Sequence, residues 1–147
     1  MQDISYKEID LWVREELSQH GEWLVDRFIE ALERGGHVDT GALVDSFDYH
    51  TSSNQGAQTL TVTFLTFGRL MEATSRRRAK SAERFPRSGN GTVWAKKNHR
   101  PKRIQWYNKN RYAGYGRLIR RLTAGMSDAE LLRIRGILNR AKQELSF

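Results

Sequence analysis

The sequence predicts an α+β domain with a long N-terminal helix, a small antiparallel β-sheet, an extended basic arm and two C-terminal helices. Three observations predict this class. Apolar residues recur at helical spacing near both ends of the chain. Between these ends, one central stretch alternates apolar residues with threonine, and residues 73–103 show no periodicity. With 147 residues, the chain is long enough for a single domain with its own core.

Residues 5–34 form the first predicted helix, because apolar side chains recur there on one helical face. That face comprises Ile9, Trp12, Val13, Leu17, Leu24, Phe28 and Leu32, and acidic residues fill most of the remainder. Gly35 and Gly36 are expected to end the helix. Gly21 is a weak point, since a glycine inside a helix costs about 1 kcal/mol relative to alanine.

The sheet is predicted from the middle of the chain. Asp39 or Thr40 can cap a short helical turn, after which a first strand begins near Phe47. Residues 52–56 are rich in turn-forming types, and residues 59–67 alternate apolar side chains with threonine. The alternation slips at Phe64 and Leu65, which predicts a bulge or burial of both faces there. The two strands are expected to form an antiparallel hairpin.

Residues 73–103 are predicted to form a long loop or arm. A loop of this length is uncommon inside a compact domain and is usually functional or disordered. Two helices should follow. The first carries an apolar stripe opposed by arginines; the stripe comprises Tyr112, Tyr115, Leu118, Ile119 and Leu122. The second begins with a capping box made by Ser127 and Glu130. Its apolar positions are Leu131, Ile134, Leu138, Ala141 and Leu145.

Charge divides the chain into two halves. Residues 1–72 hold 13 acidic and 5 basic residues, whereas residues 73–147 hold 4 acidic and 20 basic ones. Such asymmetry indicates either a nucleic-acid-binding patch or subunits that dock through opposite charges. The sequence has no cysteine, no signal-peptide pattern at its start and no apolar run long enough for a membrane span. A disulfide-rich, thiol-dependent or membrane-spanning protein is therefore not expected.

No pattern in the sequence argues for catalysis. The four histidines lack the spacing of metal ligands, and neither a phosphate-binding glycine loop nor a nucleophile-elbow motif occurs. We therefore expect no enzymatic activity, no metal and no cofactor.

The basic stretch is the strongest physical signal for a binding site. The candidate contacts to a neighbouring subunit or to nucleic acid are Arg76, Arg77, Arg78, Lys80, Arg84, Arg87, Lys96, Lys97, Arg100, Lys102, Arg103 and Trp106. The cations could neutralise phosphates while nearby aromatic rings stack on bases. Equally, the aromatics could be core or interface anchors, and the cations could contact an acidic protein surface. Both interpretations stay open.

A family resemblance rests on two short motifs. Asp39, Thr40, Gly41, Leu43 and Ser46 give the pattern D-T-G-x-L-x-x-S after a long helix, and Gly68 and Glu72 lie in F-G-R-L-M-E, expected at the end of a strand. This order resembles the tail-completion, head–tail joining or minor tail (neck) proteins of tailed phages. The segment R-I-Q-W-Y at residues 103–107 is similar to the one that leads into the C-terminal helices of some members. Family members often carry Glu-x-Gly where this chain has Glu72-Ala73-Thr74.

The resemblance implies a virion structural protein that forms a homo-oligomeric ring at the phage neck. Its expected partners are further copies of itself, portal or adaptor proteins, tail proteins and DNA in the channel, with no membrane. The protein would be made in the host cytoplasm and located in the virion. The main alternative is a nucleic-acid-binding protein that uses the basic arm, and a small basic ribonuclease of the toxin type comes last.

Overall fold

The computed structural model describes residues 4–84 and 104–145, with side chains in the first range described as far as Arg77. The long helix α1 (Tyr6–Arg34) comes first. The remaining elements are α2 (Ala42–Asp45), β1 (Asp48–Asn54), β2 (Ala57–Thr63), α3 (Phe67–Arg84), α4 (Asn108–Ala124) and α5 (Asp128–Glu144). The predicted α+β class is confirmed, with a long N-terminal helix, a two-stranded antiparallel sheet and two C-terminal helices.

Helix α1 begins and ends close to the predicted residues, because hydrogen bonds cap both of its ends. The Glu8 N–H donates to Ser5 Oγ at 3.4 Å, and the Ser5 N–H donates to Glu8 Oε2 at 2.8 Å, which forms a capping box. The helix ends at Gly35, whose N–H donates to the Ala31 carbonyl at 3.1 Å. Gly21, the predicted weak point, lies where the hairpin crosses α1. A Cβ there would come within 2.6 Å of the Tyr49 ring.

Strands β1 and β2 pair in a continuous antiparallel register from Asp48 opposite Thr63 to Asn54 opposite Ala57. Gln55 and Gly56 form the turn with φ of 50° and 82°. Positive φ at both central positions matches the twist of a tight hairpin, so the turn is shorter than the predicted 52–56. Strand β2 ends at Thr63, so the prediction of a strand through Phe67 is wrong; Phe67 begins α3.

Helix α3 corrects a second prediction. Residues 73–84, expected to be part of a structureless arm, continue α3. Apolar and small residues recur along this helix at helical spacing, but after Met71 none of them is large, so the sequence gives only a weak signal for a helix. Residues 85–103 lie outside the described part of the chain.

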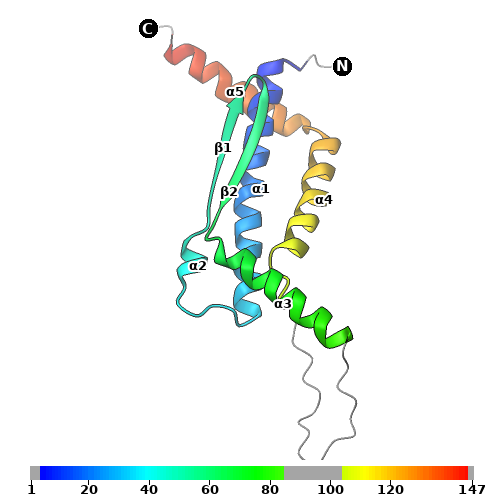
Figure 1. Cartoon of the computed structure of the whole chain (residues 1–147). Helices are drawn as coiled ribbons and strands as arrows, with labels where there is room; N and C mark the ends of the chain where they lie inside the picture. Colours follow the sequence, from blue (N-terminus) through cyan, green and yellow to red (C-terminus); the bar gives the residue numbers. More distant parts are fainter. Residues whose placement is uncertain (1–3, 85–103, 146–147) are drawn as a thin grey trace, which may run out of the picture.

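The elements are arranged around α1 (Figure 1). The hairpin and α4 both pack along α1, and α5 crosses it near its N-terminal end. Helices α2 and α3 lie at the other end of α1, where the main core forms. Its buried members are Leu24, Phe28, Leu32, Leu43 and Trp106. The Phe28 and Trp106 rings meet edge to face with centroids 5.3 Å apart.

The two C-terminal helices form as predicted. At the start of α5, the Glu130 N–H donates to Ser127 Oγ at 3.4 Å, and the Ser127 N–H donates to Glu130 Oε2 at 2.8 Å. Leu131 and Ile134 are buried, with exposed fractions of 4% and 0%. The apolar stripe does not stay buried to its end, because Leu145 is exposed.

Candidate interaction site

The first motif builds the short helix α2. Gly41 has φ of 78°, a left-handed conformation that glycine adopts without strain. The next N–H, that of Ala42, donates to Thr40 Oγ1 at 3.4 Å. This places Leu43 in the core with an exposed fraction of 5%. Asp39 is exposed and has no hydrogen-bond partner among the described residues.

Ser46 and Gly68 join the two motifs to each other. Ser46 Oγ donates to the Leu43 carbonyl at 2.7 Å and accepts from the Leu65 N–H at 3.1 Å, which ties α2 to the segment before α3. Gly68 then packs directly against Leu43 and Trp106. A Cβ on Gly68 would lie 2.9 Å from a methyl group of Leu43 and 3.0 Å from the Trp106 ring, so this close approach requires glycine.

Glu72 binds the start of α4 from α3. Its Oε1 accepts from the Asn108 N–H at 3.2 Å, and its Oε2 accepts from Arg69 Nη1 at 3.0 Å. One turn along α3, Ser75 Oγ accepts from the Ile104 N–H at 2.8 Å. Trp106 Nε1 donates to the Gly68 carbonyl at 3.2 Å. The segment 104–108 is therefore fixed to α3 by hydrogen bonds to Gly68, Glu72 and Ser75.

We call this assembly the motif joint. It comprises Leu43, Ser46, Gly68, Glu72 and Trp106, of which the first four belong to the two sequence motifs. The sequence assigned Trp106 to an interface or nucleic-acid contact. That assignment is wrong, because Trp106 has an exposed fraction of 1% and lies in the core.

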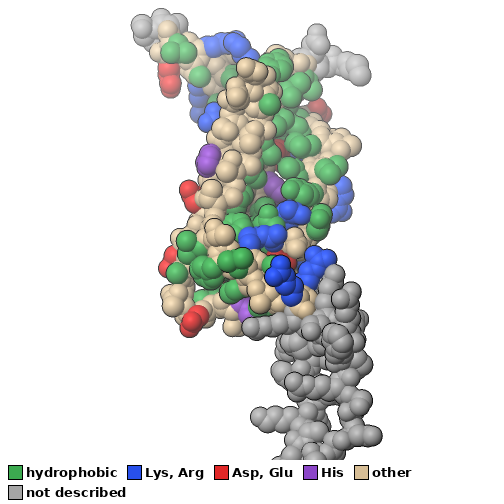
Figure 2. Space-filling view, viewed as in Figure 1, with side chains coloured by type: hydrophobic (Ala, Val, Ile, Leu, Met, Phe, Trp, Pro, Cys, Tyr) green, Lys and Arg blue, Asp and Glu red, His purple; other side chains and the backbone are tan. Residues whose placement is uncertain are grey.

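The predicted cations fall into three groups. Arg76 and Arg77 are exposed on α3. Arg78, Lys80 and Arg84 belong to the same helix, but their side chains lie outside the described part of the structure. Six others lie outside it altogether: Arg87, Lys96, Lys97, Arg100, Lys102 and Arg103. Figure 2 shows Lys and Arg side chains gathered over α3 and α4.

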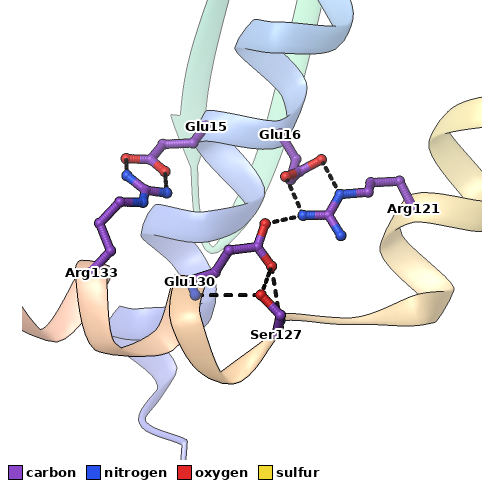
Figure 3. Close-up of polar contacts among 6 residues, drawn as sticks. All are labelled: Glu15, Glu16, Arg121, Ser127, Glu130 and Arg133. Carbon is purple, nitrogen blue, oxygen red and sulfur yellow. Dashed lines mark hydrogen bonds and ion pairs between the residues drawn. The ribbon is translucent and has the colours of Figure 1, made fainter.

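Sequence reasoning missed that much of the opposite charge is paired within the chain (Figure 3). Arg121 of α4 forms a two-pronged contact with Glu16 of α1, both distances being 3.0 Å, and also contacts Glu130 of α5. Arg133 pairs with Glu15 in the same region. Two of the acidic residues on α1 thus hold the C-terminal helices in place.

A third ion pair between α1 and the C-terminal helices lies closer to the N-terminus of α1. Arg135 Nε donates to Glu8 Oε1 at 2.7 Å, and this hydrogen bond lowers the pKa of Glu8. The pKa of Glu130 is also lowered, chiefly by the hydrogen bond from the Ser127 N–H. Carboxylates held in this way stay charged as the pH falls.

His20 lies between α1 and α4. The ring is buried and stacks on Trp23 with centroids 5.7 Å apart. Arg117 Nη1 lies 3.3 Å from His20 Nδ1. Burial lowers the pKa of His20, and the positive charge of Arg117 lowers it further. The histidine is therefore neutral at neutral pH, with Nδ1 placed to accept from the guanidinium.

The apolar stripe of α4 covers α1 only in part, with Leu118 and Leu122 half-buried. Gly114 packs against α1, because a Cβ there would lie 3.3 Å from both His20 and Leu24. The opposite side of α4 exposes Tyr112 and Ile119, at 64% and 63%. The helical spacing identified these residues correctly as one face but gave no indication that the face would remain uncovered.

A groove of about 440 Å³ runs between α4 and β2. Leu17, Leu24 and Phe28 of α1 form its floor. Its walls are Leu60 and Val62 of β2 and Tyr115 and Leu118 of α4, among others. The groove and the exposed face of α4 adjoin, since Tyr115 belongs to both.

Comparison of the chain with models of known protein families, with curated proteins and with solved structures finds no significant match. Among the described residues, no helix is both long enough and apolar enough to cross a membrane. The same part of the chain contains no cluster of three or more histidine or acidic residues able to hold a metal ion.

Proposed function

We propose that this protein is a structural subunit of the tailed-phage neck, acting in tail completion or head–tail joining as a homo-oligomeric ring without catalytic activity. The observation that supports the proposal is the motif joint. The two motifs singled out by the family resemblance are distant in sequence, yet Gly68 of the second packs against Leu43 of the first and against Trp106. Ser46 and Glu72 make hydrogen bonds beside this contact. A chance match of short motifs gives no reason for such convergence.

The role of each motif residue supports a structural function. Ser46 joins α2 to the segment before α3, Gly68 allows a close helix contact, and Glu72 binds the start of α4. The polar groups of Ser46 and Glu72 are hydrogen-bonded within the fold. A joint that holds the two ends of a basic segment suits a subunit that clasps its neighbours, such as other copies, portal or adaptor proteins and tail proteins.

The direct test is genetic and uses a phage that encodes this chain. Deleting the gene should yield DNA-filled heads and separate tails that fail to join, as seen by electron microscopy. Antibodies against the protein should label the junction of wild-type particles. Normal joined particles from the deletion strain would contradict a role at the neck.

A second test asks whether the basic segment is the clasp. Because Ser75 and Ile104 are hydrogen-bonded to each other, a short Gly/Ser linker can replace residues 76–103 with its ends already adjacent. We expect this variant to stay folded, to lose only the helical circular dichroism of residues 76–84 of α3, and to lose ring assembly. Rings of normal size from the variant would exclude the segment as the clasp.

The nucleic-acid-binding alternative rests on the exposed Arg76 and Arg77, which continue into the basic segment. It predicts micromolar or tighter binding to DNA or RNA that weakens steeply with salt as phosphate contacts are lost. Light scattering of nuclease-treated protein at low and high salt separates the two functions. A ring-sized oligomer supports the neck protein, and a salt-independent monomer that copurifies with nucleic acid supports the alternative.

A further inference from the structure

The uncovered face of α4 combines exposed apolar residues with one basic margin. The face lies opposite Gly114, the residue that packs on α1. Tyr112, Gly116 and Ile119 form its centre, and Lys109 and Arg120 lie along one margin. A Cβ on Gly116 would meet no atom within 4 Å, so the centre is open to close approach. Helix α4 contains no acidic residue. Two copies of this face would therefore repel each other.

A complementary face lies on α1. Glu22, Asp26 and Glu33 are exposed and have no ion-pair partner among the described residues, while Arg27 and Arg34 are both occupied by Glu30. Between the three acids lie Val25 and Ile29, both only half-buried.

We call this the acidic face of α1. It repeats the pattern of the α4 face with the opposite charge, and each spans about 16 Å at the usual rise per residue.

The two faces lie on opposite sides of the α1–α4 pair. Helical geometry places successive residues 100° apart, so the acidic face, centred near Ile29, points away from His20, which contacts α4. The α4 face points outward from the other side. Figure 2 shows Lys and Arg side chains over α4 on the right of that view. A contact between two different faces on opposite sides is head to tail, which generates a ring or a filament.

We propose that the outer face of α4 in one copy docks on the acidic face of α1 in the next copy. This inference rests on the proposed self-association and names the contact that makes it. Tyr112 and Ile119 would pack against Val25 and Ile29, while Lys109 and Arg120 meet Glu22, Asp26 and Glu33. The exposed apolar area gives the contact its stability, and the charges set its direction.

The test reverses the charge of each face separately. One variant carries Lys109→Glu with Arg120→Glu, and the other carries Glu22→Lys, Asp26→Lys and Glu33→Lys. Each should be folded and monomeric at concentrations at least tenfold above those at which the wild type associates, because like charges then oppose each other. An equimolar mixture should assemble, since each variant restores the partner's complement.

The matched control is Arg140→Glu with Lys142→Glu, which makes the same change of charge on exposed residues of α5. It should associate like the wild type. A second pair compares Ile119→Ser with Leu132→Ser, whose side chains are similarly exposed at 63% and 67%. Only the former should weaken association. Sedimentation velocity measures all of these species.

The outcomes separate this contact from the proposed function. Wild-type oligomers that persist in both single-face variants would overturn the contact but leave the ring-forming neck protein intact. A mixture that stays monomeric would also overturn it. A wild type that is monomeric at every concentration, from a gene whose deletion leaves phage particles joined, would overturn both proposals.

Discussion

The carboxylate of Glu72 accepts a hydrogen bond from the backbone N–H of Asn108 at 3.2 Å, across 36 positions of sequence. An acidic side chain at a helix N-terminus satisfies a free N–H group and interacts favourably with the helix dipole. Here that carboxylate comes from another helix, α3, rather than from the residue before α4. The start of α4 thus depends on the placement of α3.

Glu72→Ala should lower the free energy of unfolding by about 2–3 kcal/mol, since it leaves a backbone N–H and Arg69 without their buried acceptor. Urea denaturation followed by circular dichroism measures the change. Glu144→Ala is the control, because Glu144 of α5 is exposed and has no ion-pair partner in the described structure. Equal stability of the two variants would show that the contact contributes nothing.

Gly68→Ala should destabilise the protein by about 1–3 kcal/mol, because the added methyl group overlaps Leu43 and Trp106. Gly136→Ala in α5 provides the opposite case. Its Cβ would meet no atom within 4 Å, so the substitution should stabilise the helix by about 0.5–1 kcal/mol. Thermal unfolding of the two variants should therefore shift in opposite directions.

Protonation of His20 should cost stability. Since its pKa is lower in the folded protein, the unfolded chain binds this proton more readily, and stability falls as the pH drops through the ordinary histidine range near 6.5. His20→Gln should reduce the fall in urea midpoint between pH 7.5 and pH 5.5. An unchanged slope in the variant would assign the pH dependence to other groups.

Glu16→Gln should lower the urea midpoint clearly, whereas Glu15→Gln should leave it within measurement error. Both residues contact an arginine through two hydrogen bonds, but the Glu16 side chain is 9% exposed and that of Glu15 is 28% exposed. A solvent-exposed ion pair contributes little to the free energy of unfolding. Neutralising the carboxylate of a buried ion pair lowers that free energy more. High salt should reduce the difference in urea midpoint between the two variants only slightly, because salt screens a buried ion pair weakly.

The elements that the sequence predicted well are those whose apolar spacing matches their burial. In α1, Phe28 and Leu32 lie on the face that forms the core, so periodicity and structure agree. Helix α3 was missed because the residues that continue its apolar face after Glu72 are small and stand among charged residues, so the periodicity is weak. Strand β2 was drawn too long because Phe64 and Phe67 are β-favouring residues, yet they serve the aromatic cluster and the start of α3.

Only part of the candidate site could be predicted from the sequence. The motif positions were identified, but their contact with Trp106 depends on the path of the chain across α3, which no local pattern encodes. The pairing of Arg121 with Glu16 joins residues 105 positions apart. A charge asymmetry between halves cannot distinguish pairing within one chain from pairing between chains. The structure shows the former for Arg121, Arg133 and Arg135.

The hydrogen bond between Ser75 and Ile104 has a consequence for how this fold can change. It brings the backbone at residues 75 and 104 together, so a linker that replaces the residues between them has only a short distance to span. Such a replacement removes residues 76–84 of α3 together with the basic segment. A peptide or a fluorescent domain grafted in their place would have both of its ends attached at one point of the scaffold.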